Sequence, residues 1–172
     1  MKKALNVLCA IFVAVVAVLL QSCSPPPEDR FEYAASPFTA SVEGELDGIS
    51  FSATVLCNPT VSESDGVILS AHIYSPASLE GITLSRTRDG QTSARLGSAS
   101  CDVGGFAELG NVLACLLPEE PHLRVEHDGD VTKYFFSGYR GEVLYRFQCN
   151  SLTPSAVSGE GFIMYISGEI TK

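Results

Sequence analysis

From Phe38 onward, the chain contains short runs of alternating apolar and polar residues, several of them separated by Asp-Gly pairs. This pattern restricts the folds that the chain can adopt. Alternation with a period of two is typical of a strand with one buried face. Asp-Gly favours the type I′ turn of a two-residue hairpin, so Asp47-Gly48, Asp89-Gly90 and Asp128-Gly129 each predict a hairpin. A chain built from such hairpins is expected to form an antiparallel sheet.

Nine strands are predicted, and no long crossover separates them. A sheet of this size must curl or split to bury its apolar face. We therefore expect a mainly β (α+β) fold, with a strongly curved antiparallel sheet or half-barrel of about nine strands. The predicted strands are 38–46, 49–57, 67–75, 82–88, 91–101, 123–127, 131–137, 142–149 and 162–170.

One stretch, between Gly104 and Pro118, has helical periodicity: its apolar residues recur at spacings of three and four and form one stripe. The helix falls between the fifth and sixth predicted strands, so we expect it to lie on the concave face of the sheet. Its stripe would then meet the inward strand positions around a candidate apolar cavity. The residues predicted to line it are Phe51, Val55, Leu109, Leu113, Leu116, Val143, Phe147, Met164 and Ile166. A packed core has the same pattern, because a sequence does not report how completely a space is filled.

The amino-terminal residues differ from the rest of the chain. Lys2 and Lys3 precede an uncharged, largely apolar run over 4–20, which ends at Leu20-Gln21-Ser22-Cys23. A positive start, an apolar middle and a small residue before the cut are the parts of a secretory signal. An uncleaved span is the alternative, since a run of about 17 residues is at the lower limit for crossing a bilayer. An uncleaved anchor, however, has no need of Ser-Cys at this point.

The residues Leu20 to Cys23 resemble the lipobox of bacterial lipoproteins. The resemblance implies that Cys23 receives a diacylglycerol and becomes the first mature residue. It predicts a signal peptide over 1–22, a lipid-anchored flexible tether over 23–37 and a domain over 38–172. Each buried methylene adds about 0.8 kcal/mol, so two or three acyl chains would hold the protein at a membrane. We expect an extracytoplasmic location, lipid-anchored to the cell membrane, or to the outer membrane if the envelope has two.

The charge balance argues against nucleic acid as a partner. The chain has 11 basic and 20 acidic residues, and loss of Lys2 and Lys3 leaves 9 basic residues, a net charge near -11. A negative field of this kind also disfavours direct docking onto anionic lipid headgroups.

Four cysteines remain after Cys9 and Cys23 are set aside: Cys57, Cys101, Cys115 and Cys149. In an exported domain they could form two disulfides with three connectivities. Cys57 and Cys149 both continue the inward positions of a strand, so a bridge between them is one hypothesis. Buried free thiols that pack as small apolar groups are the alternative.

No catalytic motif is evident in the sequence. It contains no nucleophile elbow, phosphate loop, zinc-type His pair or redox Cys-x-x-Cys. His122 and His127 are five residues apart across a predicted strand, so their side chains are expected to face opposite sides. We therefore predict neither an enzyme nor a metal or cofactor site.

Four stretches have distinctive strand and turn patterns: Phe38–Gly44, Leu46–Ala53, Tyr74–Leu84 and Leu96-Gly97. These patterns resemble the lipoprotein-carrier superfamily, the LolA/LolB-like proteins, and especially its small lipoprotein members in clostridia-type bacteria. The resemblance implies a half-open barrel whose concave apolar side, covered by helices, receives acyl chains or lipidated partners. This sequence departs from the carriers because it shows no evident helix before the first strand and only one helical lid.

Two functions follow as hypotheses. The first is a membrane-anchored, non-enzymatic lipoprotein that binds a lipid or apolar ligand, such as an acyl chain, inside a curved sheet. The second is an envelope protein-protein interaction module whose core is fully packed and whose function lies on its outer face.

Overall fold

The computed structural model describes residues 30–102, 104–118 and 122–171. Cys23, the predicted signal peptide and the first part of the predicted tether lie outside these residues. Within the described ranges, none of the helices combines the length and the hydropathy that crossing a bilayer requires.

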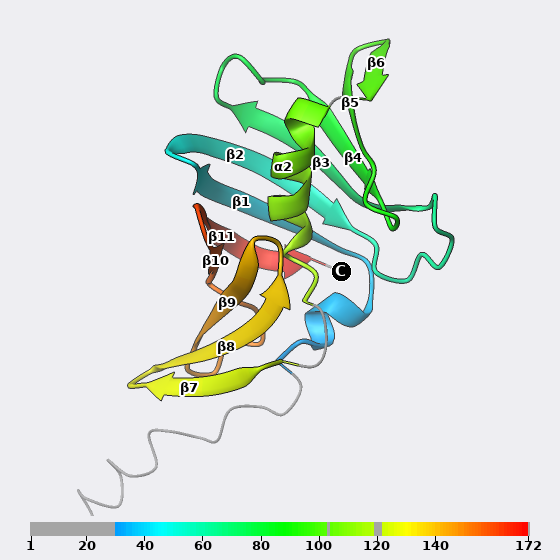
Figure 1. Ribbon diagram of the computed structural model, residues 1–172. Coiled ribbons are helices and arrows are strands. Elements are labelled where there is room, and N and C mark those ends of the chain that lie inside the picture. The colour runs from blue at the N-terminus through cyan, green and yellow to red at the C-terminus, as the bar shows by residue number, and fades with distance from the viewer. Residues whose placement is uncertain (1–29, 103, 119–121, 172) are drawn as a thin grey trace, which may run out of the picture.

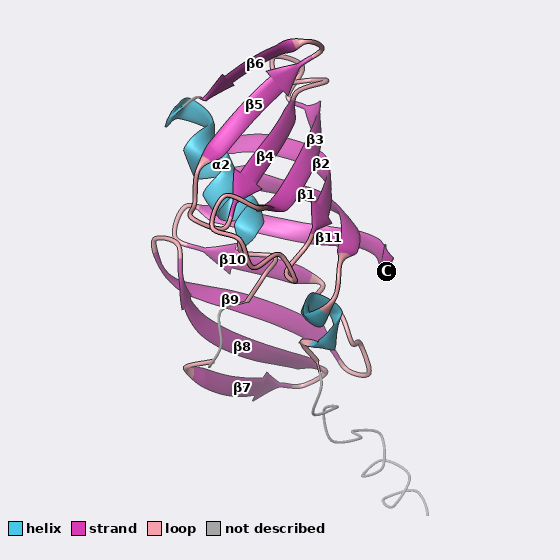
Figure 2. Ribbon diagram, turned by 90° about the vertical axis from the view of Figure 1, so that its right-hand side faces the viewer, coloured by secondary structure: helices cyan, strands magenta, loops and turns pink. Residues whose placement is uncertain are grey.

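The described residues form one antiparallel sheet of eleven strands, which is curved and unclosed (Figure 1). The strands are β1 (Phe38–Leu46), β2 (Ile49–Cys57), β3 (Val67–Ser75), β4 (Thr83–Thr87), β5 (Thr92–Leu96), β6 (Ala99–Asp102), β7 (Arg124–Asp128), β8 (Val131–Gly138), β9 (Gly141–Gln148), β10 (Ala156–Gly159) and β11 (Phe162–Thr171). Their order is β6-β5-β4-β3-β2-β1-β11-β10-β9-β8-β7. Figure 2 shows this succession from β6 at one end of the sheet to β7 at the other. Strands next to each other in sequence are paired, except β6 and β7, which lie at the two edges of the sheet; β1 pairs with β11 to join the two halves of the chain.

The curved antiparallel sheet is confirmed, but the predicted count of about nine strands is too low. The predicted strand 91–101 is divided into β5 and β6 at Gly97, whose φ is 60°. A left-handed residue of this kind turns the chain instead of extending it. The other additional strand, β10, lies in the predicted loop that contains Pro154, and its four residues are too few to show an alternating pattern.

The predicted helix is present as α2 (Gly104–Ala114), which lies over the concave face, in front of the central strands in Figure 1. Its closest packing is against β4 and β5. A Cβ on Gly110 would lie 2.6 Å from Oγ1 of Thr92 in β5, so the glycine allows the helix backbone to approach the sheet closely. Leu109 and Leu113 face the core from this helix and are buried.

The described residues before β1 belong to the folded domain. The flexible tether predicted over 23–37 therefore extends too far along the chain. The ring of Phe31 makes edge-to-face contacts with four aromatic rings at centroid distances of 5.0 to 5.7 Å. These rings belong to Tyr134, Phe136, Tyr145 and Phe147 of β8 and β9.

A short 3-10 helix, η1 (Glu32–Ala35), follows Phe31, where the sequence shows no evident helix. Tyr33 in this turn is 4% exposed, and its hydroxyl donates a hydrogen bond to the carbonyl oxygen of Leu116, at 3.1 Å. The segment from Arg30 therefore packs against the sheet and against the residues that follow α2.

The predicted bridge between Cys57 and Cys149 is wrong. Both residues are free thiols. Cys57 ends β2, whereas Cys149 follows β9. Three strands, β1, β11 and β10, separate β2 from β9 in the sheet. The inward orientation predicted for Cys57 is confirmed by its burial, but orientation alone does not bring two strands together.

Candidate functional site

The nine residues predicted to line one apolar cavity gather in one hydrophobic cluster beneath and beside α2. Eight of them are at most 6% exposed, and Ile166 is partly buried against the others. All nine thus lie together in or against the hydrophobic core. Only three of the nine, Phe51, Leu109 and Val143, line the cavities described below.

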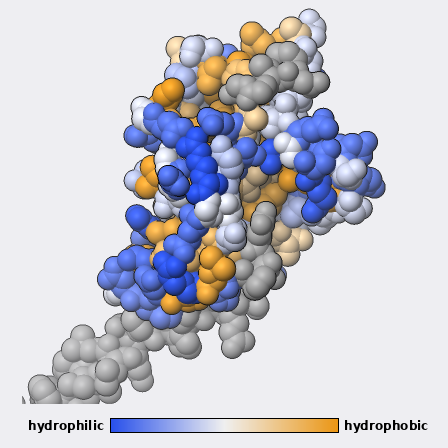
Figure 3. Space-filling model, in the orientation of Figure 1, coloured by the Kyte–Doolittle hydropathy of each residue, from blue (hydrophilic) through white to orange (hydrophobic). Residues whose placement is uncertain are grey.

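The apolar cavity is a space of about 270 Å³ beside the first half of α2. Its walls are formed by the β1–β2 hairpin, by α2 and by the segment that follows β3. Most of the lining side chains are apolar, and the charged groups are Asp47 and Glu108. Its lining residues are Leu46, Asp47, Ile49, Phe51, Pro76, Leu79, Phe106, Glu108 and Leu109. Ile49 is 62% exposed, so an apolar side chain stands at the mouth. Figure 3 shows that apolar surface is interrupted by hydrophilic residues on this face of the molecule.

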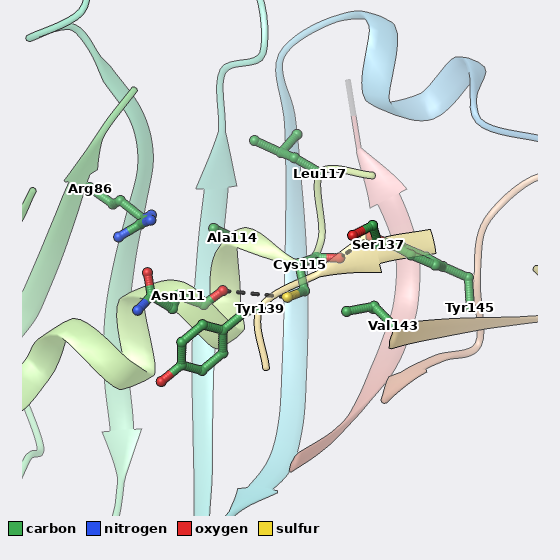
Figure 4. A pocket seen from close by; sticks show the side chains of 10 residues that line it. Arg86, Asn111, Ala114, Cys115, Leu117, Ser137, Tyr139, Val143 and Tyr145 are labelled. Atoms are coloured by element: carbon green, nitrogen blue, oxygen red, sulfur yellow. Dashed lines mark hydrogen bonds between the residues drawn. The ribbon is translucent and has the colours of Figure 1, made fainter. Parts of the chain in front are cut away.

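Two further cavities border the second half of α2. The hairpin cavity, of about 230 Å³, lies between α2 and the β8–β9 hairpin and is shown in Figure 4. The arginine cavity, of about 380 Å³, lies between the end of α2, η1, β3 and β4, and is named for Arg86 and Arg88. Arg86, Ala114 and Leu117 line both spaces, so the two cavities adjoin each other.

Hydrogen bonds hold the end of α2 against β9. The hydroxyl of Tyr145, which is 2% exposed, donates to the carbonyl oxygen of Cys115 at 2.6 Å. The thiol of Cys115 in turn donates to the carbonyl oxygen of Asn111 at 3.5 Å, as drawn in Figure 4. A buried hydroxyl that bonds a carbonyl at a helix end satisfies two polar groups at once.

The rim ion pairs, formed by Arg140, Asp47 and Glu108, connect three elements at the mouth of the apolar cavity. Arg140 in the β8–β9 turn donates to both carboxylate oxygens of Asp47 in the β1–β2 turn, at 2.8 and 2.9 Å. Its Nη2 also donates to Oε1 of Glu108 in α2, at 3.1 Å. These hydrogen bonds lower the pKa of Asp47 and raise the pKa of Arg140.

The described residues contain no group of three His, Cys, Asp or Glu side chains placed to hold a metal ion. His122 contacts the rings of Tyr134 and Phe136, whereas Nδ1 of His127 is 3.3 Å from the hydroxyl of Thr132. The two histidines thus have separate surroundings. Cys23 lies outside the described residues.

Sequence reasoning missed Arg86 and Arg88 as cavity residues. Leu84 and Arg86 alternate along β4, so they share the inward-facing side of that strand, whereas Arg88 follows the strand and is exposed. Leu84 is fully buried. Arg86, at a position where a strand normally places an apolar residue, was the signal that could have identified this cavity.

No protein-family model matches this chain, and no curated protein does either. The chain is similar to a solved structure of an uncharacterised conserved protein from Thermus thermophilus, with 13% identity and a TM-score of 0.48, covering 84% of this chain and 83% of that one. It is also similar to a LolA superfamily protein from Nitrosomonas europaea, with 11% identity and a TM-score of 0.40, covering 86% and 94%. A third solved structure is an outer membrane lipoprotein-sorting protein domain from Vibrio parahaemolyticus, with 10% identity and a TM-score of 0.43, covering 80% and 88%. The superfamily that the sequence resembles is thus also named among these solved structures.

Proposed function

We propose that this protein is a non-enzymatic, extracytoplasmic lipoprotein, anchored through acylated Cys23, which binds a lipid or another apolar ligand in the apolar cavity. The observation that carries the proposal is the cavity itself. Leu46, Ile49, Phe51 and Phe106 present apolar surface to an open space between α2 and the β1–β2 hairpin. Apolar surface left beside an open space is what an apolar ligand would cover, since burial stabilises by about 25 cal/mol per Å².

The size of the cavity sets how a ligand would enter. Its volume of about 270 Å³ lies just below the range of about 300–1,000 Å³ that is usual for ligand pockets. A longer chain would need α2 to move outward, so that the ligand replaces the contacts of Phe106 and Leu109. The rim ion pairs tie Glu108 of this helix to Arg140, and they would limit that movement.

The anchor would keep the domain close to the membrane. Six residues separate Cys23 from Arg30, the first described residue. A fully extended chain advances by about 3.3–3.6 Å per residue, so the anchor and the domain would be at most about 25 Å apart. The apolar cavity lies farther from the anchor, at the end of β1 that is remote from the amino-terminal segment. The Leu20–Cys23 pattern, which resembles a lipobox, supports this part of the proposal.

Titration of a soluble form beginning at Ser24 with an uncharged fluorescent ligand, the methyl ester of dansyl-undecanoic acid, tests the apolar site. Ile49→Arg should abolish binding, because the long side chain at the mouth obstructs the cavity. Leu123→Arg is the matched control, since Leu123 is 61% exposed and does not line the apolar cavity. Equal binding by both variants, or none by the parent protein, would contradict the proposal.

Labelling of cells with radioactive palmitate tests the anchor. The parent chain should incorporate the label and sediment with membranes, whereas Cys23→Ser should remain unlabelled. An unlabelled parent chain would refute acylation at Cys23 while leaving the apolar site to the titration.

A protein-interaction module is the second candidate function. The observation that favours it is the burial of eight of the nine predicted cavity residues in the hydrophobic core. Recovery of a specific envelope protein with the anchored chain, together with no binding of the uncharged ligand, would favour this candidate.

A further inference from the structure

The arginine cavity differs in chemistry from the apolar cavity. Arg86 lies in β4 and the exposed Arg88 lies just beyond that strand, and both line a space of about 380 Å³. The other lining residues carry no charge; they are Ala34, Pro59, Ile68, Ala114, Leu117 and Pro118.

Backbone carbonyls hold the two guanidinium groups without neutralising them. Nη1 of Arg86 donates to the carbonyl oxygen of Gly90 at 2.7 Å and to Oγ1 of Thr92 at 3.3 Å. Arg88 donates from Nε to the carbonyl oxygen of Val61 at 2.6 Å, and from Nη2 to that of Pro59 at 2.8 Å. A guanidinium has five N–H donors, so each arginine is fixed in place and keeps donors for another group.

Neither arginine has a carboxylate partner within the part of the chain that the structure describes. The same residues include three other cations, Arg124, Lys133 and Arg140, that do form ion pairs. Asp89 attracts Arg86 electrostatically but forms no ion pair with it, and its carboxylate accepts hydrogen bonds from Thr87 and Gln91. Arg30, Arg95 and Arg146 likewise form no ion pair among the described residues, but only Arg86 and Arg88 line this cavity.

We infer that the arginine cavity is a binding site for a carboxylate or phosphate group, held by Arg86 and Arg88. A planar guanidinium matches the geometry of these anions and can donate two parallel hydrogen bonds to them. Burial lowers the pKa of Arg86, yet an arginine remains protonated, so its positive charge stays in a partly dry space. Ile68 and Leu117 provide apolar walls beside the charge, which suits the anionic end of an amphiphile as well as a free anion.

Calorimetric titration of the form beginning at Ser24 with inorganic phosphate, and fluorescence titration with dansyl-undecanoic acid, test this site. Hydrogen bonds to charged groups contribute about 1.5–3 kcal/mol, so Arg86→Gln and Arg88→Gln should each weaken binding about tenfold or more. Arg95→Gln is the matched control, because Arg95 is exposed on β5 and does not line this cavity. If Arg86→Gln fails to fold, the binding measured for Arg88→Gln decides the outcome, because Arg88 is exposed.

The source of the anion follows from comparing the two ligands. Phosphate binding that depends on the arginines identifies a free anion as sufficient, whereas acid binding without phosphate binding identifies an anionic amphiphile. Binding of both ligands that is unchanged in Arg86→Gln and Arg88→Gln, or binding of neither, would overturn the inference. The uncharged methyl ester reports on the apolar cavity separately, so failure of one site is distinguished from failure of the other.

Discussion

Arg140 and Asp47 are 93 residues apart in sequence, yet the guanidinium of one meets both carboxylate oxygens of the other at 2.8 and 2.9 Å. Both residues occupy turns and have positive φ values, 57° and 49°. Their contact joins the β8–β9 turn to the β1–β2 turn of the curved sheet. Because Glu108 of α2 binds the same guanidinium, the contact also sets where the helix lies relative to the apolar cavity.

Asp47→Asn should reduce the acid sensitivity of the fold. The folded-state pKa of Asp47 is lowered by its hydrogen bonds to Arg140, so its contribution to stability is present above the unfolded value of about 4 and is lost as the pH falls through the folded value. We expect the Tm of the parent protein to fall more steeply below pH 4 than that of Asp47→Asn.

Asp128→Asn serves as a control for that comparison. Asp128 pairs with Lys133 inside one hairpin, and its pKa is lowered for the same reason. Hydrogen exchange in α2 should accelerate in Asp47→Asn only. Equal exchange in both variants would show that the rim ion pairs do not hold the helix.

Gly110→Ala should destabilise the protein although alanine favours helices by up to about 1 kcal/mol. The added methyl would lie 2.6 Å from Oγ1 and 2.9 Å from Cγ2 of Thr92. Overpacking of this kind costs about 1–3 kcal/mol in the free energy of unfolding. Gly110→Ala should lower the free energy of unfolding by less in the Thr92→Ala background than in the parent protein. Urea denaturation of Gly110→Ala/Thr92→Ala and of Thr92→Ala alone measures this difference. Strict additivity of the two changes would exclude the contact.

Amino-terminal truncation should distinguish a tether from a part of the domain. A chain beginning at Arg30 keeps Phe31 and Tyr33, whereas one beginning at Ser36 loses both. Removal of a buried aromatic side chain costs about 3–5 kcal/mol, which is a large part of the roughly 5–15 kcal/mol typical of a domain. Urea denaturation should therefore show near-loss of stability for the shorter chain. Matching midpoints for the two chains would contradict the packing described here.

Thiol reactivity should differ between Cys57 and Cys149. Burial raises the pKa of Cys57 to about 12, and the thiolate is the reactive form. Iodoacetamide applied to the folded protein should modify the half-buried Cys149 and spare Cys57, as peptide mass mapping can establish. The peptides that contain Cys57 and Cys149 should have the same masses with and without reductant, whereas a linked pair would indicate a disulfide between them.

Local turn chemistry explains why much of the fold could be predicted. The three Asp-Gly hairpins are confirmed between β1 and β2, β4 and β5, and β7 and β8. Gly48, Gly90 and Gly129 have φ values of 84°, 94° and 59°, which glycine adopts without strain. These features depend on a few adjacent residues, so the sequence displays them directly.

Contacts between distant residues explain what could not be predicted. Phe31 packs against Tyr134 and Phe147, more than 100 residues later, and no local pattern indicates that pairing. The inward residues of the candidate site were identified, but their packing density depends on the exact position of α2. The cavities consequently lie at the margins of the predicted cluster, and the rim ion pairs were not foreseen.

Native mass spectrometry of the soluble form beginning at Ser24, purified from cells, measures ligand occupancy most directly. We expect an apolar lipid bound to the parent protein and to Leu123→Arg, and none bound to Ile49→Arg. A parent protein that carries no lipid, or an Ile49→Arg variant that carries as much as the parent, would contradict ligand binding in the apolar cavity.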